Sequence, residues 1–492
     1  MQSGGHSVGG ACRRAMSQPA VRPGDLAQHA LRAELLATLA AFLASRLAAD
    51  QSLCVGLSGG RDSVVLLHAL VHLRAADFAG GRWRLSAMHV EHGLSEHAGA
   101  WAAFCHELCA RLAVPLHVVR VEVVRNDRAG LEAAARRVRY AAFADCPADW
   151  LALAHHRDDQ AETVLFRLLR GAGVAGAAGM RSARALPRGP RLIRPLLELP
   201  GSALADYAAA NSLAWVEDES NADCRFRRNF LRREVLPRLS TVFPAAAPAL
   251  ARAAAHFAEA QELLDEVAHA DRQCVAGDGG RIELARLQGL SPARARNLLR
   301  YELASAGWRS PDARWLAEAQ RQLVGSAAGA QPCLRTEDGE LRVHRGRLYV
   351  LTGTAPALPS AVCWRGEEQV AWGERLISFR PVVGGGLSRR RLSGLSVWLR
   401  LRQGGERLQL DTRRPRRSLS QLLQEAGVPC WERHRLPLLW AGDELAWVGG
   451  GIGCAAAFAC AAGEDGLAIG EEVSAARAPA ADGFVAPGTV RP

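Results

Sequence analysis

Short apolar runs alternate with longer segments of helical periodicity over the first third of the chain. The apolar runs predict strands over residues 53–57, 84–90, 116–123 and 150–154. Segments of helical period lie before and between them, at 26–48, 63–74, 96–113 and 130–145. Because strands that alternate with helices are joined by right-handed crossovers, we expect a parallel, doubly wound α/β sheet.

The pattern changes after residue 170. Residues 171–235 are irregular and rich in Gly and Arg, 243–325 read as helical, and 334–382 alternate like short strands. The expected organisation has six parts: a disordered leader (1–24), the α/β domain (25–240), a helical domain (241–327), a linker with short strands (328–392), a small α+β domain (393–465) and a disordered tail (466–492).

A polar turn interrupts the apolar pattern directly after the first predicted strand. It reads Ser58-Gly59-Gly60-Arg61-Asp62-Ser63 and leads at once into a predicted helix. Glycines let the backbone approach an anion, and amide groups at a helix start favour negative charge. The turn therefore predicts a phosphate site, although an ordinary strand-to-helix turn is the alternative. It is not a Walker loop, because the chain contains no lysine.

Two further polar segments follow later strands. Residues 89–95 follow the second strand, and His155 begins a segment that includes Asp159 and Glu162. Ligands of doubly wound sheets bind at the carboxyl ends of strands, so Ser58, His89 and His155 should face one crevice. If a helix starts at His155, its side chain shares one face with the two carboxylates. Such a group could bind Mg²⁺ or orient a nucleophile, or it could simply be an acidic helix start.

Arginine supplies all 61 basic side chains, and the net charge is +11. This balance favours a polyanionic partner. Three groups of arginines stand out, each with a solvated surface as the alternative: Arg136 with Arg139 near Tyr140, five arginines between 225 and 233, and the stretch from Arg389 to Arg417.

Cysteine usage and hydropathy narrow the cellular setting. The twelve cysteines include no Cys-x-x-Cys pair, and Cys105 and Cys109 read as buried helical residues. This pattern fits a reducing cytoplasm, and no apolar stretch is long enough for a membrane span. We expect a cytoplasmic protein with no membrane partner. The sequence leaves the oligomeric state open, and a homodimer is one alternative.

The turn at 58–63 resembles the pyrophosphate loop (PP-loop) of the N-type ATP pyrophosphatases, which cleave ATP to AMP and pyrophosphate. Within that group, the chain resembles the tRNA(Ile)-lysidine synthetases. The resemblance rests on motifs that occur in the same order, at residues 58–63, 89–95, 132–140, 154–163, 179–181, 194–197, 215–232, 417–419, 424–429 and 435–438. It departs at Glu91, where the family more often has Asn or His.

The resemblance implies a two-step reaction. ATP adenylates the C2 oxygen of the wobble cytidine in the CAU anticodon of an isoleucine tRNA, and pyrophosphate leaves. Free L-lysine then attacks C2, AMP leaves, and the lysidine that forms changes codon reading from AUG to AUA. ATP, Mg²⁺, L-lysine and this tRNA are the implied cofactors and partners.

The resemblance also implies roles for individual residues. Asp62 would position Mg²⁺ or the reacting base, and the carboxylates of Asp159 and Glu162, with His155, would bind or deprotonate the lysine amine. Arg136 and Arg232 would contact the adenylate phosphate or the anticodon. The implied ATP site contains Ser58, Gly59, Gly60, Arg61, Asp62, Ser63 and His89. The implied tRNA contacts are Arg225, Arg228, Arg232, Arg389, Arg390, Arg413, Arg414, Arg416 and Arg417.

Three other functions are compatible with a phosphate-binding turn. A tRNA 2-thiolase shares the loop but typically uses paired cysteines. An amidotransferase-coupled relative would need a glutaminase domain. A nucleotide-sensing RNA-binding protein would have no use for an acid–base cluster beside the phosphate loop, so the residues favour an enzyme.

Overall fold

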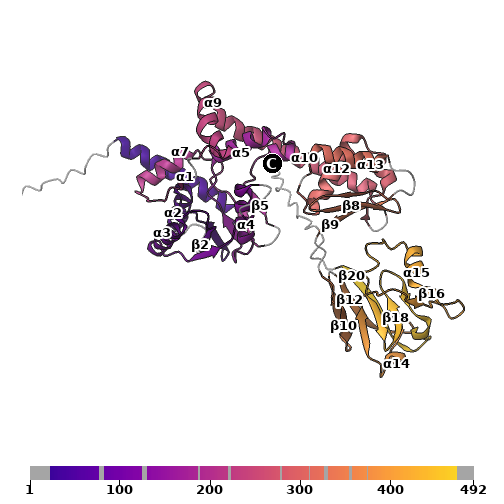
Figure 1. The fold of residues 1–492 in the computed structure, drawn as a ribbon. Helices are drawn as coiled ribbons and strands as arrows, with labels where there is room; N and C mark the ends of the chain where they lie inside the picture. The colour runs from indigo at the N-terminus through magenta and orange to yellow at the C-terminus, as the bar shows by residue number, and fades with distance from the viewer. Residues whose placement is uncertain are drawn as a thin grey trace, which may run out of the picture. The chain divides into compact units, whose positions relative to one another are not determined.

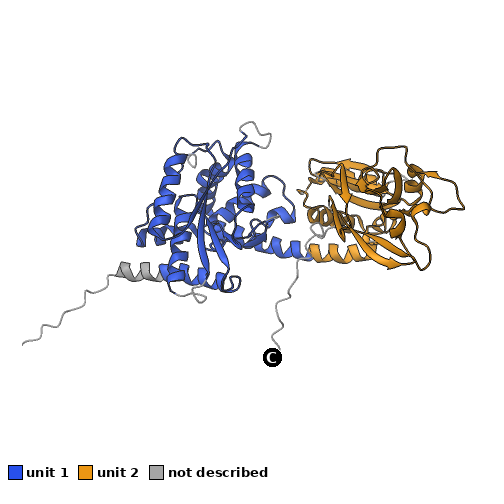
Figure 2. Cartoon of the chain, turned by 90° about the horizontal axis from the view of Figure 1, so that it is seen from below, with its two compact units in different colours: residues 1–263 blue, residues 264–492 orange. Residues whose placement is uncertain are grey.

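The computed structural model describes residues 23–76, 83–124, 130–186, 189–219, 223–277, 280–309, 311–325, 331–353, 357–373 and 375–473. Nearly all of the expected leader and residues 474–492 of the expected tail lie outside these ranges. The chain divides into two compact units, residues 1–263 and 264–492, which are described separately (Figure 2).

The first unit is built on a six-stranded sheet with the order β3-β2-β1-β4-β6-β5 (Figure 1). Every pairing is parallel except that of β5 with β6. The strands are β1 Ser52–Gly56, β2 Arg84–Glu91, β3 Leu116–Arg120, β4 Trp150–Ala152, β5 Ala183–Ala185 and β6 Arg191–Ile193. The predicted parallel, doubly wound sheet is confirmed.

Helices cover both faces of this sheet. Successive side chains of β1 point to opposite faces, and each face has its own apolar core. Leu53 and Val55 pack with apolar residues of α1, α2, α3 and α7, whereas Cys54 packs with Phe143 of α4 on the other face. The helices of this unit are α1 Pro23–Ala44, α2 Arg61–Ala75, α3 Ala98–Arg111, α4 Leu131–Ala144, α5 Arg157–Leu168, α6 Val174–Ala177, α7 Gly201–Ala210, α8 Arg227–Phe230, a π-helical turn Leu231–Val235 and α9 Leu236–Val242. Helix α10 Ala246–Val275 contains the boundary between the two units.

The second unit begins with a helical layer on a small antiparallel sheet. The helices are α11 Leu284–Gln288, α12 Pro292–Ser305 and α13 Ala313–Val324, and the strands are β7 Cys333–Arg335, β8 Gly339–His344 and β9 Arg347–Thr352. Leu341 and Val343 of β8 lie in the same buried core as Leu298 of α12 and Leu316 of α13. Helices and hairpin therefore form one folding module.

The remainder of the second unit is rich in antiparallel strands. One sheet has the order β10-β14-β17-β18-β19 and another β11-β12-β20-β13, with β15 and β16 forming a separate pair. Their bounds are β10 Ala361–Trp364, β11 Gln369–Trp372, β12 Arg375–Val383, β13 Leu387–Ser388, β14 Val397–Arg400, β15 Arg407–Leu408, β16 Arg417–Ser418, β17 Leu438–Ala441, β18 Glu444–Val448, β19 Gly453–Cys454 and β20 Asp465–Val473. Short helices complete the domain, namely α14 Arg389–Leu392, α15 Leu419–Glu425 and a 3₁₀ turn Ala456–Phe458.

Two expected boundaries differ from this structure. Residues 328–392 are not a linker, because β7–β9 complete the core of the helical module and β10–β12 belong to the two C-terminal sheets. The tail does not begin at 466, because β20 pairs with β12 over nine positions and buries Leu467. The pairing of β12 with β20 is not visible locally, since the two strands are far apart in sequence. Within the described ranges, no helix is long and apolar enough to cross a membrane.

Candidate active site

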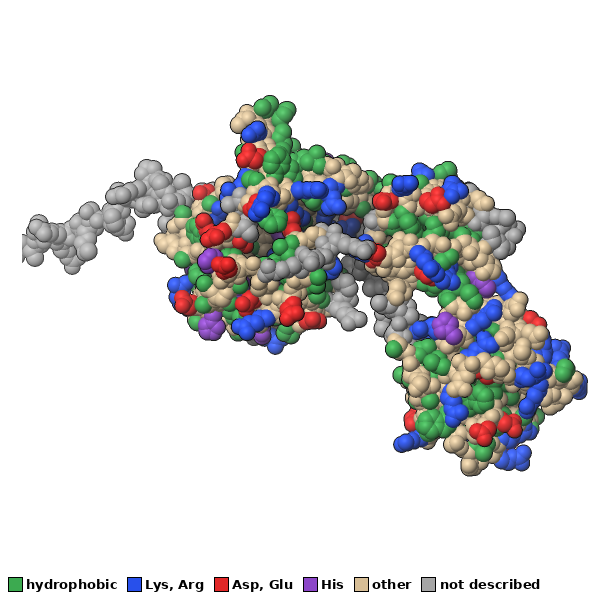
Figure 3. All heavy atoms as spheres, in the orientation of Figure 1, with side chains coloured by type: hydrophobic (Ala, Val, Ile, Leu, Met, Phe, Trp, Pro, Cys, Tyr) green, Lys and Arg blue, Asp and Glu red, His purple; other side chains and the backbone are tan. Residues whose placement is uncertain are grey.

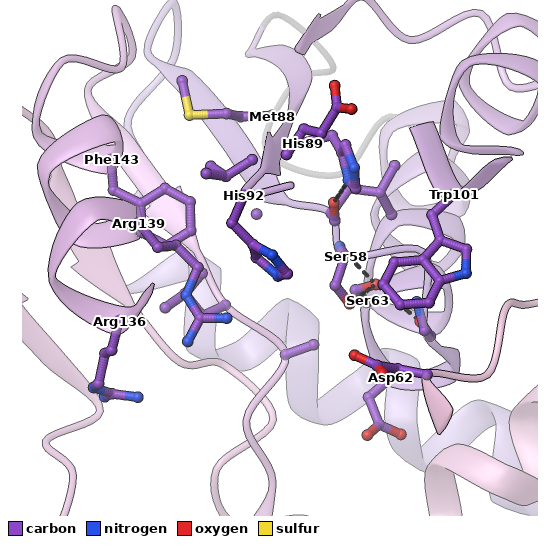
Figure 4. Close-up of a pocket in the computed structure, with 18 of the residues that line it drawn as sticks. Ser58, Asp62, Ser63, Met88, His89, His92, Trp101, Arg136, Arg139 and Phe143 are labelled. Atoms are coloured by element: carbon purple, nitrogen blue, oxygen red, sulfur yellow. Dashed lines mark hydrogen bonds between the residues drawn. The ribbon is translucent and has the colours of Figure 1, made fainter. Parts of the chain in front are cut away.

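A cavity of about 360 Å³ opens at the carboxyl ends of β1, β2 and β4. Ser58, His89 and His155 all line it, so the predicted convergence of the three strand ends is confirmed. Figure 4 shows Ser58, Ser63 and Asp62 on one wall and Arg136 and Arg139 on the opposite wall. The cavity therefore joins a phosphate-type turn to a cationic surface.

The turn between β1 and α2 is held by its own serines. The Ser58 amide donates to Ser63 Oγ at 3.2 Å, and Ser63 Oγ donates to the Gly60 carbonyl at 2.8 Å. Ser58 Oγ lies 3.1 Å from Ser63 Oγ. These bonds close the turn around the N-terminus of α2, where helix amides favour an anion. The arrangement is that of an anion-binding loop. His89 Nδ1 lies 2.9 Å from the Leu57 carbonyl and so supports the start of this loop from β2.

Gly59 is the position in the turn that requires glycine. Its φ is +86°, and a Cβ there would lie 2.8 Å from Val216 Cγ2 and 3.3 Å from Cys105 Sγ. A Gly59→Ala variant should lose about 1–3 kcal/mol of unfolding free energy through backbone strain, and the displaced turn should weaken ATP binding. Urea unfolding and equilibrium ATP binding measure these effects.

Gly60→Ala is the matched control for that experiment. Gly60 has ordinary φ of −73°, and the nearest atom to an added Cβ is Ser58 Oγ at 3.5 Å. This substitution should change the unfolding free energy little. Equal losses in the two variants would contradict the role assigned to the backbone at Gly59.

His156 connects the loop to α5. Its Nε2 lies 3.5 Å from Asp62 Oδ2 and 3.5 Å from Asp159 Oδ2. Its Nδ1 accepts the Asp158 amide at 3.3 Å, and Asp159 accepts the His156 amide at 3.0 Å, which together form a capping box at the start of α5. The Nε2 atom of the ring thus lies between two carboxylates at the cavity edge.

The charges around His156 shift two pKa values in opposite directions. Burial alone would lower the pKa of His156, but the hydrogen bond to Asp62 and the charges of Asp159, Asp62 and Asp158 raise it above 6.5. Burial alone would raise the pKa of Asp62, but His156 and Arg61 hold it below 3.8. The contact therefore favours the charged form of both groups relative to the isolated side chains.

These shifts predict how stability depends on pH. The stabilisation from His156 is complete below its unfolded pKa of 6.5 and is lost as pH rises through the higher folded value. Asp62 acts in the acid range, where its contribution is lost as pH falls below 3.8. As pH rises above about 6, the unfolding temperature should therefore fall less in His156→Gln than in the unmodified chain. If the unfolding temperatures of the two proteins fell equally with pH, the contribution assigned to His156 would be contradicted.

The structure separates His155 from the two carboxylates that the sequence placed on its face. Helix α5 begins at Arg157, so His155 precedes it and does not share its face. His155 Nδ1 is buried and has no hydrogen-bond partner within the described chain. Burial, followed by the charges of Arg194, Arg136 and Arg139, holds the pKa of His155 well below 6.5. His155 is thus a neutral imidazole in the cationic wall, and His156 takes the place beside the carboxylates.

Asp159 and Glu162 are brought together by Arg232, which lies on the π-helical turn Leu231–Val235. Arg232 Nε donates to Glu162 Oε1 at 2.5 Å and its terminal nitrogen to Glu162 Oε2 at 3.0 Å. The same nitrogen donates to Asp159 Oδ1 at 2.8 Å. Burial raises the pKa of Glu162, and the hydrogen bond and charge of Arg232 offset only part of that rise.

The cationic wall is organised around Tyr140. Arg136 donates to the Tyr140 hydroxyl at 3.1 Å and Arg194 donates to it at 3.3 Å. Arg139, on the same helix, is half-buried, and its burial followed by the charge of Arg136 lowers its pKa. Glu132 of the same helix pairs with Arg228 of α8 at 3.2 Å.

The side chains around the cavity bear on whether the site can hold Mg²⁺. Among the described side chains, no group of three or more His, Cys, Asp or Glu is arranged to hold a metal ion. Asp62 nevertheless lines the cavity beside the loop. Mg²⁺ is commonly held by one or two carboxylates together with substrate phosphates, so Asp62 fits as a ligand that acts with a bound nucleotide.

The arginines predicted to bind tRNA lie in both units. Arg225 is exposed and paired with Asp223 at 2.7 Å. In the C-terminal domain the exposed members are Arg389, Arg390, Arg413, Arg414 and Arg416, while Arg417 is half-buried and paired with Glu425. Figure 3 shows basic side chains gathered along one side of this domain. The structure thus places an extended cationic surface there.

Comparison with known proteins decides the family. A model of the PP-loop domain matches residues 31–239, one of the TilS substrate binding domain matches 282–349, and one of the TilS substrate C-terminal domain matches 397–470. A tRNA(Ile)-lysidine synthase of Aromatoleum aromaticum is 45% identical over 87% of this chain and 99% of its own length. The chain belongs to the tRNA(Ile)-lysidine synthase family.

Other matches agree with this assignment. A protein of the same name from Nitrosomonas europaea is 43% identical over 85% of this chain and 91% of its own length. Among solved structures, the U34-tRNA thiolase NcsA of Methanococcus maripaludis covers 47% of this chain and 80% of its own, with 18% identity and a TM-score of 0.41. That likeness is too weak to support an argument. The family expected from the ordered motifs is confirmed.

Sequence reasoning gave no role to four members of the site. The signal for His156 was that it stands three residues before Asp159, the spacing of a capping box, although Ser or Thr is the usual first residue of that motif. Arg139 and Tyr140 were noticed as part of a helical stripe. Arg194 stands in the 194–197 motif, but only the fold brings it to Tyr140.

Proposed function

We propose that this chain joins free L-lysine to C2 of the wobble cytidine in the CAU anticodon of an isoleucine tRNA, at the expense of ATP. The observation that carries the proposal is one cavity in which the anion-binding turn at 58–63 faces Arg136 and reaches Asp159. Such a cavity can hold a nucleotide triphosphate and a flipped base together. The family membership supports the same reaction.

The first step transfers AMP to the base. The C2 oxygen of cytidine attacks the α-phosphorus of ATP, the bond to the β-phosphate oxygen breaks, and pyrophosphate leaves. Amides of the loop, with Ser58 and Ser63, stabilise the charge that develops on pyrophosphate. Bound Mg²⁺ would neutralise phosphate charge, and Asp62 is the residue we propose to hold it. Arg136 on the opposite wall is placed to bind the α-phosphate bidentately.

The second step forms the new carbon–nitrogen bond. The lysine ammonium must lose a proton before it can attack C2, because a protonated amine has no free electron pair. Attack forms the C2–N bond, the C2–O bond breaks, and AMP leaves with the oxygen. We assign Asp159 and Glu162 to binding the amine and accepting its proton. His155, as a neutral imidazole, serves as a hydrogen-bond partner in the cavity wall.

The proposed partners follow from this chemistry. They are ATP, L-lysine and the isoleucine tRNA, with Mg²⁺ as the cofactor. A cytoplasmic location accords with a tRNA substrate, and a homodimer stays a prediction. Residues 25–240 stay the proposed catalytic part, and 241–327 and 393–465 stay proposals for two tRNA-binding parts. The structure adds β7–β9 to the first of these two and β10–β12 with the whole of β20 to the second.

The direct test incubates the chain with ATP, labelled L-lysine and a transcript of the isoleucine tRNA. Label should enter the tRNA only when ATP is present, and pyrophosphate should appear in equal amount. A transcript with a substituted wobble base serves as the control. Pyrophosphate release that does not depend on the tRNA, or absence of label from it, would overturn the proposal.

The basic surface of the C-terminal domain should strengthen tRNA binding through phosphate contacts. Replacing Arg413, Arg414 and Arg416 together with Gln should weaken binding, and the slope of log affinity against log salt should fall by up to about 3, one unit for each lost contact. All three side chains are exposed, so the unfolding temperature should stay unchanged. Filter binding at several salt concentrations measures the slope. An unchanged slope would show that these arginines do not contact the RNA.

A further inference from the structure

The cation site that the proposed reaction needs is already filled by the chain itself. Arg232 contacts both oxygens of Glu162 and one oxygen of Asp159, while His156 contacts the other oxygen of Asp159. These contacts use the same carboxylate atoms that a lysine ammonium would bind. A lysine side chain and the Arg232 guanidinium therefore compete for one place.

The competition is unequal in the free protein. The Glu162 side chain is only 8% exposed, so its carboxylate is costly to leave without a cationic partner. Arg232 is tethered beside it, whereas free lysine must also lose translational freedom on binding. Lysine should therefore bind poorly while Arg232 stays in place.

Arg232 is suited to leave the carboxylates of Asp159 and Glu162. Its side chain is 46% exposed although its partner Glu162 is buried, so solvent and ligands can reach the guanidinium. It lies on the π-helical turn Leu231–Val235, a rare geometry that is frequent at functional sites. A phosphate accepts a guanidinium bidentately, as a carboxylate does, so an incoming phosphate is a matched alternative partner.

We propose that Arg232 exchanges partners during the reaction: it occupies Asp159 and Glu162 in the free protein and moves to a phosphate of the bound tRNA or adenylate, which opens the carboxylates to lysine. The proposal rests on the proposed function and adds an order to it. Adenylated RNA creates the lysine site, so the amine does not enter before an electrophile is present. Arg232 is a positioning residue in this scheme.

The test measures equilibrium binding of labelled L-lysine to the full chain without ATP or RNA. Arg232→Ala should bind lysine about tenfold or more tightly than the unmodified chain, because an affinity reduced by a blocked state recovers when the block is removed. Adding AMP and the isoleucine tRNA should tighten binding in the unmodified chain but change it little in Arg232→Ala. A residue with a purely structural role would lower affinity in both conditions.

Three variants make the outcome decisive. Arg232→Lys keeps a cation at the site and should remain weak like the unmodified chain. Arg232→Gln removes the charge but keeps an N–H donor for Glu162, and should bind tightly even if Arg232→Ala is unstable. Arg238→Ala removes an 82% exposed arginine that pairs with Glu234 and should change nothing.

Two failures can be told apart. If folded Arg232→Gln and Arg232→Ala bind lysine no more tightly than the unmodified chain, partner exchange is wrong. If the unmodified chain never transfers labelled lysine to the tRNA, the proposed function itself is wrong, whatever the order of affinities. Thermal unfolding of each variant confirms that a folded protein is being compared.

Discussion

Asp62→Asn should lower tRNA-dependent pyrophosphate release by about a thousandfold, or about 4 kcal/mol of transition-state stabilisation. The substitution keeps the shape of the side chain but removes the negative charge at the loop. Asp62 lines the cavity and pairs with Arg61 and His156. Without its charge, a metal ion bound with the nucleotide loses a ligand, and His156 loses the partner that raises its pKa. Single-turnover release of pyrophosphate from labelled ATP measures the effect.

Asp158→Asn is the matched control. Asp158 lies 3.8 Å from the other ring nitrogen of His156 and accepts the amide of Gly201, and an Asn oxygen can accept the same amide. Its activity should therefore stay within a few fold of the unmodified chain. If Asp62→Asn and Asp158→Asn lose activity equally, the loss reflects the His156 environment in general and not a role of Asp62 at the loop.

Glu162→Gln should separate the two chemical steps. The amide keeps the size of the buried side chain but cannot accept a proton or hold an ammonium ion through charge. Pyrophosphate release with tRNA should continue, while transfer of lysine should fall by about a hundredfold or more, within the range that positioned general bases contribute. Rapid-quench measurement of both products in one reaction resolves the steps, and adenylated tRNA should accumulate.

Glu132→Gln serves as the comparison for Glu162. Glu132 is half exposed and pairs with Arg228 at the surface, away from Asp159. Its loss should leave both steps near normal. A Glu162→Gln protein that transfers lysine at the normal rate would remove this carboxylate from the mechanism, and equal loss of both steps would point to a role in adenylation.

The sequence predicted those strands whose apolar pattern is visible within a few consecutive residues. The apolar runs that suggested strands at 53–57 and 84–90 correspond to Ser52–Gly56 and Arg84–Glu91, because both strands are buried and their flanking turns are polar. Strands β5 and β6 were not predicted, because they lie in the irregular, Gly- and Arg-rich segment 171–235, where three residues show no period of their own. Strand β4 is equally short, but it lies in a longer apolar run at 150–154.

The sequence predicted where the site lies better than it predicted how the side chains are arranged there. The rule that ligands bind at strand ends brought Ser58, His89 and His155 together correctly, since it needs only the topology. The choice between His155 and His156 depended on where α5 begins, and a shift of two residues reversed it. The ion pair of Arg232 with Glu162 joins segments that are distant in sequence, so no spacing rule could have found it.

The pairing of β12 with β20 has a consequence for how the protein is made. Strand β12 ends at Val383, but its long partner begins only at Asp465, so β12 leaves the ribosome well before β20 is made. Until then one side of β12 has free amide and carbonyl groups, which other chains can join. A nonsense mutation shortly before codon 465 would therefore yield a protein whose catalytic unit is complete in sequence but whose C-terminal sheet is prone to aggregate.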